Sequence, residues 1–298
     1  MLFRSWKDSQ DSVSHADGTL ADGPIALCEV QGYAYAARLG MARLSAALGD
    51  NVRAAECDRL ARELQARFDA AFWCDELGLY ALALDGKKRP CRVRSSNVGH
   101  CLYTKIALPS RAKAINARLL SDEMFSGWGV RTLATNERRY NPMSYHNGSV
   151  WPHDNAIIAL GCSEYAGREL PLRVLESFYE AASFAEFQRL PELFCGFSRR
   201  PGQEPIRYPV ACLPQAWAAA SPFSFLHAVL GLHVNARDKR VTLCRPQLPS
   251  FLESLEIRHL RVGNDHIDLR LVRYPEDVAV TVLQASGSVD LAVLKSTA

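Results

Sequence analysis

The spacing of apolar residues along the first part of the chain predicts paired helices. Apolar positions recur every three or four residues from about Pro24 to Leu48 and again up to Phe72, with a Gly49-Asp50 turn between the two runs. A link this short makes the two helices an antiparallel hairpin. A short β-hairpin is expected next, over residues 73–86. The helical pattern then returns and predicts helices over residues 98–107, 111–120, 153–165, 170–187 and 213–232.

The pattern changes to a period of two after about Val234. Four segments alternate apolar and polar residues, with Gly and Asp turns between them: VTLCRP, LEIRHLRVG, HIDLRLVRY and VAVTVL. This alternation predicts a small antiparallel β module. We therefore expect two domains, a mainly helical one over residues 1–234 and the β module over residues 235–298.

Two long linkers separate the predicted helical hairpins, residues 121–152 and 188–212. Linkers longer than about 12–15 residues are usually functional or disordered, and these hold too many aromatic residues to be disordered. Helical hairpins whose long loops gather at one end are typical of an α/α toroid or solenoid with its site at that end.

The segment from Asn141 to Asn155, NPMSYHNGSVWPHDN, combines aromatic rings with side-chain amides, hydroxyls and imidazoles. Buried polar groups without partners cost about 1–3 kcal/mol each, so a plain core segment would not carry so many. Rings beside polar groups suit a sugar, which has both C–H faces and hydroxyl edges. The alternative is a structural loop that caps the next helix, with Pro152 in its first turn. Local chemistry leaves both interpretations open.

Composition excludes several classes of function. The chain is 48% hydrophobic and 22% charged with a formal net charge of +3, which gives no reason to expect nucleic acid as a partner. No apolar run reaches the ~18 residues of a membrane span. The nine cysteines include no C-x-x-C pair, which indicates buried thiols in a reducing compartment and hence a cytoplasmic protein. No metal, phosphate or dinucleotide motif is present, so neither a metal nor a cofactor is expected.

Four acidic residues stand among aromatic residues and are candidates for general acid–base chemistry. Asp8 and Asp11 follow Trp6, Glu29 lies on the first predicted helix, and Glu192 lies in RLPELFCGF. Apolar surroundings and hydrogen bonds are the means by which enzymes tune carboxyl groups. Taken alone, each of these carboxylates is more simply explained as a helix cap or as part of a salt bridge.

Seven sequence blocks, taken together and in order, resemble the catalytic half of bacterial amylo-α-1,6-glucosidases of the glycogen-debranching type. The resemblance runs from Trp6 to about Pro246. The blocks are WKDSQDS…ADG…GPIALCEVQGYAYAA, YALALDG, SSNVGH, SGWGVRTL, YNPMSYHNGSVWPHDN, LPELFCGF and YPVACLPQAW. The resemblance implies a mainly α fold, an (α/α)6 six-hairpin toroid similar to those of trehalases, glucoamylases and mannosylglycerate hydrolases.

The resemblance also implies roles for individual residues. The W-x-D element places the general acid at Asp8, with Asp11 as the second choice, and the LPELF block places the general base at Glu192. Hydrogen bonds to sugar hydroxyls are assigned to Glu29 and Gln31. The residues implied to line the pocket are Trp6, Trp128, Arg131, Tyr145, His146 and Trp151. The implied reaction is inverting, exo-acting hydrolysis of α-glucosidic bonds in an oligosaccharide or α-glucan.

The chain departs from the family in two respects. Ser5 and Gln10 occupy positions next to the acid where glycine is expected. About seven helices are predicted, whereas a six-hairpin toroid has twelve, so we expect an incomplete ring, truncated at its N-terminal side and closed by a second chain or a missing segment. An alternative hypothesis is therefore an inactive or carbohydrate-binding remnant of a debranching enzyme. A helical toroid that serves only protein contacts would leave the polar-aromatic loops unexplained.

Overall fold

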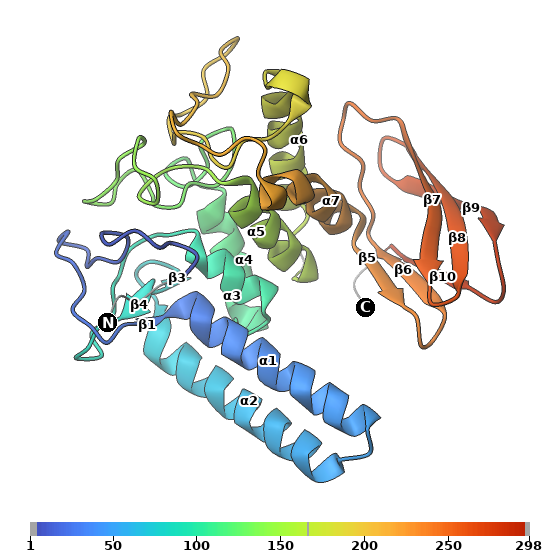
Figure 1. Ribbon diagram of the computed structural model, residues 1–298, viewed down its shortest axis with the longest axis horizontal. Helices are drawn as coiled ribbons and strands as arrows, with labels where there is room; N and C mark the ends of the chain where they lie inside the picture. The colour runs from blue at the N-terminus through green and yellow to red at the C-terminus, as the bar shows by residue number, and fades with distance from the viewer. Residues whose placement is uncertain (1–4, 166, 296–298) are drawn as a thin grey trace.

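Helices make up the body of the molecule, and β-strands form its C-terminal part (Figure 1). The computed structural model describes residues 5–165 and 167–295. Within these ranges there are seven α-helices and a short 3-10 helix: α1 (Cys28–Ala47), α2 (Asn51–Phe72), α3 (Asn97–Tyr103), α4 (Pro109–Leu119), α5 (Pro152–Glu164), α6 (Glu169–Ser183), η1 (Glu186–Gln188) and α7 (Ala216–Leu230).

The first two helices form the predicted antiparallel hairpin. Gly49 turns the chain with a φ of +83°, and the Asp50 side chain accepts a hydrogen bond from the Arg53 backbone N–H at 3.0 Å, which caps α2. The expected start of α1 at Pro24 is wrong. Strand β1 (Ala26–Leu27) pairs instead with β4 (Ala83–Leu84), and this long-range pairing delays the helix until Cys28.

The C-terminal strands form two three-stranded sheets. One contains β7 (Ser254–Val262), β8 (Asp265–Arg273) and β9 (Val278–Ala285), all antiparallel. In the other, β6 (Arg240–Cys244) lies between β5 (Leu232–Asn235) and β10 (Asp290–Leu294). β10 runs parallel to β6, which the alternating pattern did not predict. β5 begins at Leu232, and the predicted domain division at residues 234/235 stays a prediction.

The short β-hairpin expected after α2 is present in part. β2 (Trp73–Cys74) pairs with β3 (Leu79–Tyr80). Residues 81–91 then fold back, and Leu84 also bridges Pro90. The separate β1–β4 pair lies directly before α1 and joins the start of that helix to residues 83–84.

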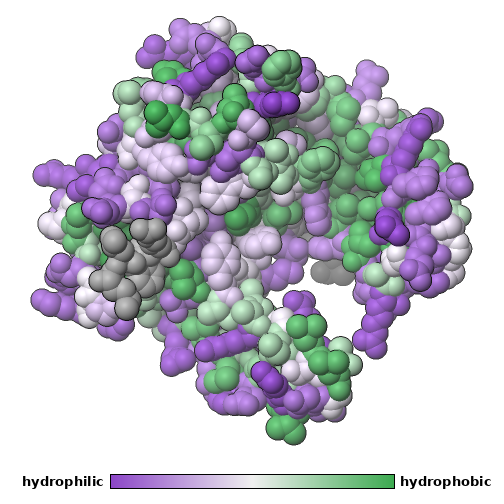
Figure 2. Space-filling model, in the orientation of Figure 1, coloured by the Kyte–Doolittle hydropathy of each residue, from purple (hydrophilic) through white to green (hydrophobic). Residues whose placement is uncertain are grey.

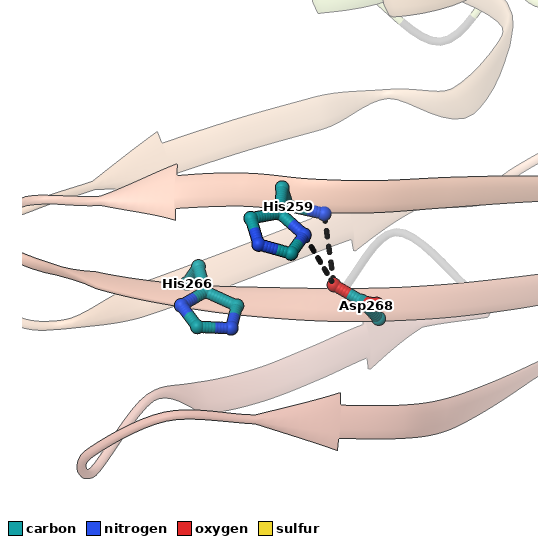
Figure 3. A group of neighbouring side chains, drawn as sticks. All are labelled: His259, His266 and Asp268. Atoms are coloured by element: carbon teal, nitrogen blue, oxygen red, sulfur yellow. Dashed lines mark hydrogen bonds and ion pairs between the residues drawn. The ribbon is translucent and has the colours of Figure 1, made fainter.

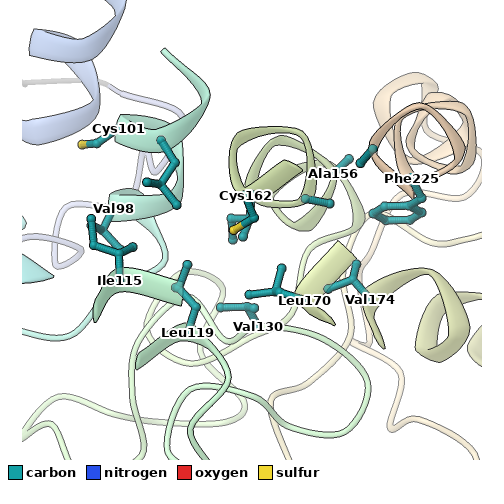
Figure 4. Close-up of a cluster of buried hydrophobic side chains, with 14 of the residues drawn as sticks. Val98, Cys101, Ile115, Leu119, Val130, Ala156, Cys162, Leu170, Val174 and Phe225 are labelled. Atoms are coloured by element: carbon teal, nitrogen blue, oxygen red, sulfur yellow. The ribbon is translucent and has the colours of Figure 1, made fainter. Parts of the chain in front are cut away.

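One apolar core joins helices α3 to α7 (Figure 4). The close packing of α3 against α5 depends on glycine: a Cβ at Gly99 would lie 2.4 Å from the Ile158 side chain, and one at Gly161 would lie 2.5 Å from the Tyr103 backbone nitrogen. Buried thiols contribute to the same core, including those of Cys101 and Cys162, as the sequence predicts. Helices α3 and α5, which meet here, carry residues of the candidate active site described below.

The long connections are tied to one another by isolated β-bridges. Val150 pairs with both Arg131 and Phe194, and Phe194 pairs with Arg207. These contacts bring the linker between α4 and α5 against the linker that follows η1. In Figure 1 the connections lie on the left and upper left, away from the C-terminal strands. The predicted gathering of loops at one side is therefore confirmed.

The far end of the α1–α2 hairpin exposes apolar side chains. Leu44, Leu48 and Val52 are 61%, 86% and 83% exposed, and hydrophobic residues are visible on this hairpin in Figure 2. An apolar flank is what an incomplete ring is expected to present. Closure of the ring by another chain or segment stays a prediction. Among the described residues, no helix combines the length and apolar composition that a bilayer span requires.

Candidate active site

A ring cluster centred on Trp6 joins the N-terminal segment to the helical body. The indole lies 5.8 Å from the His100 ring, 5.7 Å from His146, 5.8 Å from Trp151 and 5.0 Å from His153, measured between ring centroids. These partners come from α3, from the linker before α5 and from the first turn of α5. The cluster fixes the chain at Trp6 and therefore the position of the residues that follow it.

The Tyr145–Trp151 segment is shaped by its own polar groups. The Trp151 Nε1–H donates to the Tyr145 carbonyl at 3.0 Å and the Ser149 hydroxyl donates to the same carbonyl at 2.5 Å. The Asn155 side chain bonds both the backbone N–H and the carbonyl of Val130. Part of this polar segment therefore has a structural role, which is one of the two interpretations of the sequence. His146 Nδ1 is also bonded, to the Ser9 hydroxyl at 2.6 Å, whereas both ring nitrogens of His153 have no partner among the described residues.

Glu192 is buried beside this segment, with 7% of its surface exposed. Its Oε1 accepts from the Tyr145 hydroxyl at 2.7 Å, and its Oε2 accepts from the Cys212 backbone N–H at 3.1 Å. Burial, reinforced by the hydrogen bond to Glu192 and by the charges of Glu192 and Asp8, raises the pKa of Tyr145. The Tyr145 hydroxyl therefore lies within the field of both proposed catalytic carboxylates.

Asp8, unlike Glu192, is accessible to solvent. Its side chain is 60% exposed, and its Oδ1 is 4.0 Å from His146 Nε2. Burial, together with the positive charge of Lys7, lowers the pKa of His146 to about 3. The imidazole is consequently neutral near pH 7, so its contact with Asp8 is not an ion pair. The Asp8 carboxyl is thus not held by a structural salt bridge to this histidine.

Asp11, the second choice for the acid, is engaged in the fold. Its Oδ2 accepts from the Asn147 amide at 3.0 Å and lies 3.4 Å from the Arg139 guanidinium. These two contacts tie the Asp11 side chain to the linker between α4 and α5. The choice between Asp8 and Asp11 as the acid stays a prediction.

Two charged side chains, those of Lys7 and Glu29, are buried near the ring cluster. Lys7 is 5% exposed and its Nζ donates to the Thr132 carbonyl at 2.8 Å. Burial lowers the pKa of Lys7 to about 8, against the opposing effect of the Asp154, Glu29 and Cys28 charges. Glu29, on α1, is fully buried. Its neighbour Gln31 is half-buried, and its amide reaches the Leu27 carbonyl at 3.4 Å.

A hydrogen-bonded relay of Tyr33, His100 and Asp154 is the part of the site that sequence reasoning missed. The Tyr33 hydroxyl and His100 Nδ1 are 2.5 Å apart, and His100 Nε2 is 2.8 Å from Asp154 Oδ1. Burial by itself would raise the pKa of Asp154, but the hydrogen bond and charge of His100 hold it below its ordinary value. The signal was present in the SSNVGH and WPHDN blocks, which supply the histidine and the aspartate.

Several buried polar atoms of the candidate site's residues and of Asn97 have no hydrogen-bond partner among the described residues. They are Trp6 Nε1, Glu29 Oε1, both amide atoms of Asn97, His146 Nε2, both ring nitrogens of His153, and Asp154 Oδ2. Each such atom costs about 1–3 kcal/mol unless something satisfies it. The His146 and His153 rings lie against the Trp6 indole. Their unpartnered nitrogens favour a binding place for a ligand with many hydroxyl groups, which could satisfy donors and acceptors together.

Trp128 and Arg131, which were expected to line the pocket, are buried in loop packing. The Trp128 ring lies under the Arg199 guanidinium at 4.8 Å. Arg131 donates to the Gly196 carbonyl at 2.7 Å and to the Ser198 hydroxyl at 2.8 Å. The structure thus engages both side chains in holding the two linkers together, and their role in substrate binding stays a prediction.

A hollow of about 840 Å³ lies elsewhere, between α2, α4 and the end of α5. Its carboxylate, Glu164, is paired with Lys105 at 2.8 Å, and Asp8 and Glu192 do not line it. A second carboxylate is required for acid–base hydrolysis of a glycoside. The chemistry therefore points to the residues around Trp6 and not to this hollow.

Comparison with known families identifies the chain at the level of its domain. Residues 4–192 match the family described as the mannosylglycerate hydrolase MGH1-like glycoside hydrolase domain, which is more than half of the chain. The chain belongs to this glycoside hydrolase family. The matched range includes Asp8 and ends at Glu192. No curated protein matches the sequence.

Solved structures support the fold of this MGH1-like domain. The GH63 mannosylglycerate hydrolase from Thermus thermophilus, in complex with Tris, is 15% identical over 67% of this chain and 45% of its own, with a TM-score of 0.52. Neutral trehalase from Saccharomyces cerevisiae is 15% identical over 68% of this chain and 38% of its own, with a TM-score of 0.54. A GH78 rhamnosidase from Bacillus sp. GL1 covers 96% of this chain and 28% of its own at 16% identity, with a TM-score of 0.64.

These likenesses confirm the predicted fold class, a mainly helical chain of the six-hairpin type with an incomplete ring. The chain spans less than half the length of these relatives. The matched domain therefore shows the family, whereas the activity of the chain and its resemblance to amylo-α-1,6-glucosidases belong to the proposal below.

Proposed function

We propose that this MGH1-like domain is an exo-acting α-glucosidase of the amylo-α-1,6-glucosidase type, with Asp8 as general acid and Glu192 as general base. The observation that carries the proposal is the convergence of both carboxylates on the Tyr145–His146 corner. Glu192 bonds the Tyr145 hydroxyl and Asp8 lies 4.0 Å from His146. The two residues are 184 positions apart in the sequence (192 − 8), so a common site for them depends on the fold.

Hydrolysis with inversion assigns a separate task to each carboxyl group. Asp8, protonated, gives its proton to the glycosidic oxygen as that oxygen leaves the anomeric carbon. Glu192 takes a proton from a water molecule whose oxygen bonds to the same carbon from the opposite face. Asp8 loses one proton and Glu192 gains one, so the number of protons on the two carboxyl groups is unchanged. Exchange with solvent then returns each carboxyl group to its starting protonation state. Inverting enzymes hold the two carboxyl groups about 6.5–9.5 Å apart to admit the water.

The side chains around Glu192 suit the role of a base. The Tyr145 hydroxyl and the Cys212 backbone N–H each hold one carboxylate oxygen in place, at 2.7 and 3.1 Å. Each oxygen keeps a further lone pair that can accept the proton of the attacking water. Positioned acid–base groups of this kind contribute rate factors of about 10²–10⁴.

The aromatic and unpartnered polar groups suit sugar recognition. Trp217 is 42% exposed on α7, and its ring stacks on the His153 ring with a 3.9 Å centroid separation. A pyranose ring packs its C–H face against such a ring. Its hydroxyls would reach the unpartnered nitrogens of His153 and the free oxygen of Asp154. Binding of oligosaccharide or α-glucan is thus supported by groups other than the two carboxylates.

A substrate panel followed by proton NMR tests the proposal. The purified chain is incubated with an α-1,6-linked glucoside, an α-1,4-linked glucoside, trehalose and mannosylglycerate, and the first anomer released is recorded. We expect glucose from the α-1,6 substrate, released as the β-anomer because inversion converts the α configuration. Release of the α-anomer would contradict the inverting assignment.

Calorimetry with the same sugars separates hydrolysis from simple binding. Saturable binding of the α-1,6-linked oligosaccharide without product after long incubation would support the alternative, a carbohydrate-binding remnant. Preferential release of mannose from mannosylglycerate would overturn the glucosidase specificity while retaining the glycoside hydrolase class.

A further inference from the structure

A bulge in the β7–β8 hairpin places three metal-binding side chains together, outside the candidate active site. Ile257 pairs with Leu269 and Leu260 pairs with Ile267, so two residues of β7, Arg258 and His259, face one residue of β8. That residue is Asp268. Bulges of this kind re-aim a side chain and recur next to functional sites.

The bulge turns His259 toward the outer face of the hairpin. His259 has a φ of +56°, which is uncommon for a residue other than glycine. On β8, the side chains of Ile267 and Leu269 are buried, so the alternating residues His266 and Asp268 lie on the other face. Without the extra residue, His259 would not share that face with both of them.

The three side chains lie within reach of one ion (Figure 3). One ligand atom from each of His259, His266 and Asp268 can be chosen so that all three lie within 4.8 Å of one another. The two imidazole rings stack at 4.6 Å with an interplanar angle of 10°. The Asp268 Oδ1 accepts from the His259 backbone N–H at 2.8 Å and lies 3.9 Å from His259 Nδ1.

Neighbouring residues orient the ligands and occupy the nearby cations. His266 Nδ1 is 3.0 Å from the Ser286 hydroxyl, which fixes the ring and leaves Nε2 for a ligand bond. The Arg258 guanidinium is held by Glu256 at 2.7 Å. Lys239 is paired with Asp265 at 2.9 Å. The arginine that precedes His259 and the lysine that reaches the residue before His266 are thus paired with other carboxylates.

We propose that His259, His266 and Asp268 bind a divalent transition-metal ion of the zinc type. Two imidazoles and one carboxylate are the ligands such ions prefer, whereas Ca²⁺ and Mg²⁺ take oxygen ligands. Zinc bonds of about 2.0–2.2 Å require the ligand atoms to approach one another further. His259 permits this because its side chain is 79% exposed and can rotate. Water completes the coordination, and the ion joins β7 to β8.

Titration with ZnCl₂ tests the proposal on the full chain. The background is Cys212→Ser, since the Cys212 thiol is exposed and would bind zinc by itself. Isothermal calorimetry is expected to show one site, and His259→Ala and Asp268→Asn are each expected to weaken binding at least about 10-fold. Because His259 is exposed, its replacement leaves the folded core intact, and circular dichroism confirms this for each variant.

The His227/His233 pair provides a matched control. Its rings lie 6.3 Å apart and Glu164 is 4.0 Å from His233, yet it does not gather three ligand atoms. The double variant His227→Ala/His233→Ala should bind zinc as tightly as the parent and retain the zinc-dependent rise in Tm. Unchanged binding in both His259→Ala and Asp268→Asn, or loss of binding in the control, would overturn the proposal.

Discussion

At the scale of single residues, Tyr145 links the two halves of the proposed mechanism. Its ring lies 4.8 Å from the Trp151 ring, and its hydroxyl holds Glu192 Oε1. The sequence predicted Tyr145 as a pocket residue through the resemblance of its block to a known family. It did not predict the hydroxyl–carboxylate bond, because 47 residues separate the partners.

Replacement of Tyr145 by Phe tests that bond. The ring packing is retained and only the donor to Glu192 is lost. We therefore expect kcat to fall about 10- to 100-fold, which corresponds to an increase of about 1.4–2.7 kcal/mol in the activation free energy. KM should change little, because the bond orients the base and does not grip the sugar. Tyr208→Phe is the control, since Tyr208 contacts the Tyr145 ring at 5.5 Å without bonding Glu192. Equal kcat values for the two variants would exclude this role for the hydroxyl.

The buried imidazoles predict how stability depends on pH. Burial lowers the pKa of His146 to about 3 and that of His153 to about 4. An unfolded chain has ordinary histidines with pKa near 6.5, so it binds more protons than the folded chain between about pH 6.5 and 4. The free energy of unfolding therefore has its full value above about pH 6.5 and decreases as the pH falls toward 4.

Urea denaturation at pH 7 and pH 5 measures this effect. The free energy of unfolding should fall by about 1–2 kcal/mol for each buried histidine over that interval. His146→Gln should reduce the pH dependence, while His233→Gln should leave it unchanged because His233 is exposed. An identical pH dependence in wild type and His146→Gln would contradict the neutral, buried imidazole.

At the scale of secondary structure, the sequence predicted most helices but not the contacts that end or delay them. The periodic pattern located α2 through α7 within a few residues. It placed the start of α1 too early, because the pairing of Ala26 with Leu84 is not visible in local spacing. The helix expected to reach Phe187 ends at Ser183, and Phe187 itself has a non-helical φ of +53°. The parallel pairing of β10 with β6 was missed for the same reason, as alternation does not encode direction.

The close contact of α3 with α5 gives a prediction at this scale. Gly161→Ala would place a Cβ 2.5 Å from the Tyr103 backbone nitrogen. Helix backbones would have to separate, so we expect a loss of about 1–3 kcal/mol in the free energy of unfolding. Gly40→Ala on α1, where nothing lies within 4 Å of the added Cβ, should instead stabilise by up to about 1 kcal/mol. Chemical denaturation distinguishes the two, and equal effects would contradict the packing.

The same contact bears on the site, because α3 carries His100 and α5 carries His153 and Asp154. The candidate catalytic carboxylates were predictable from sequence blocks that resemble a family. The same blocks contain His100 and Asp154, but the bond between these two residues was not predicted, because 54 residues separate them. Only the folded chain shows that Trp6 covers this pair.

At the scale of the whole molecule, hydrogen bonds and a common apolar core join the helices to the C-terminal strands. Arg168 is buried, and its Nη1 donates to the Ala228 carbonyl at the end of α7 at 2.7 Å. Its other terminal nitrogen bonds the Cys244 carbonyl on β6. The apolar core likewise includes Val241 and Leu269 from the strands. The division of the chain into two domains therefore stays a prediction. Localisation in the cytoplasm also stays a prediction.

The whole account depends on the fold bringing a carboxyl group of the N-terminal segment and one of the second linker to a common sugar site. The turnover of an α-1,6-linked glucoside by Glu192→Gln, beside Glu204→Gln, tests this most directly. Glu204 lies in the same linker, is 57% exposed at its side chain and pairs only loosely with Arg207, at 3.7 Å. The account predicts that Glu192→Gln loses about 10²–10⁴-fold in kcat while Glu204→Gln hydrolyses as the wild type does. Wild-type turnover by Glu192→Gln would contradict it.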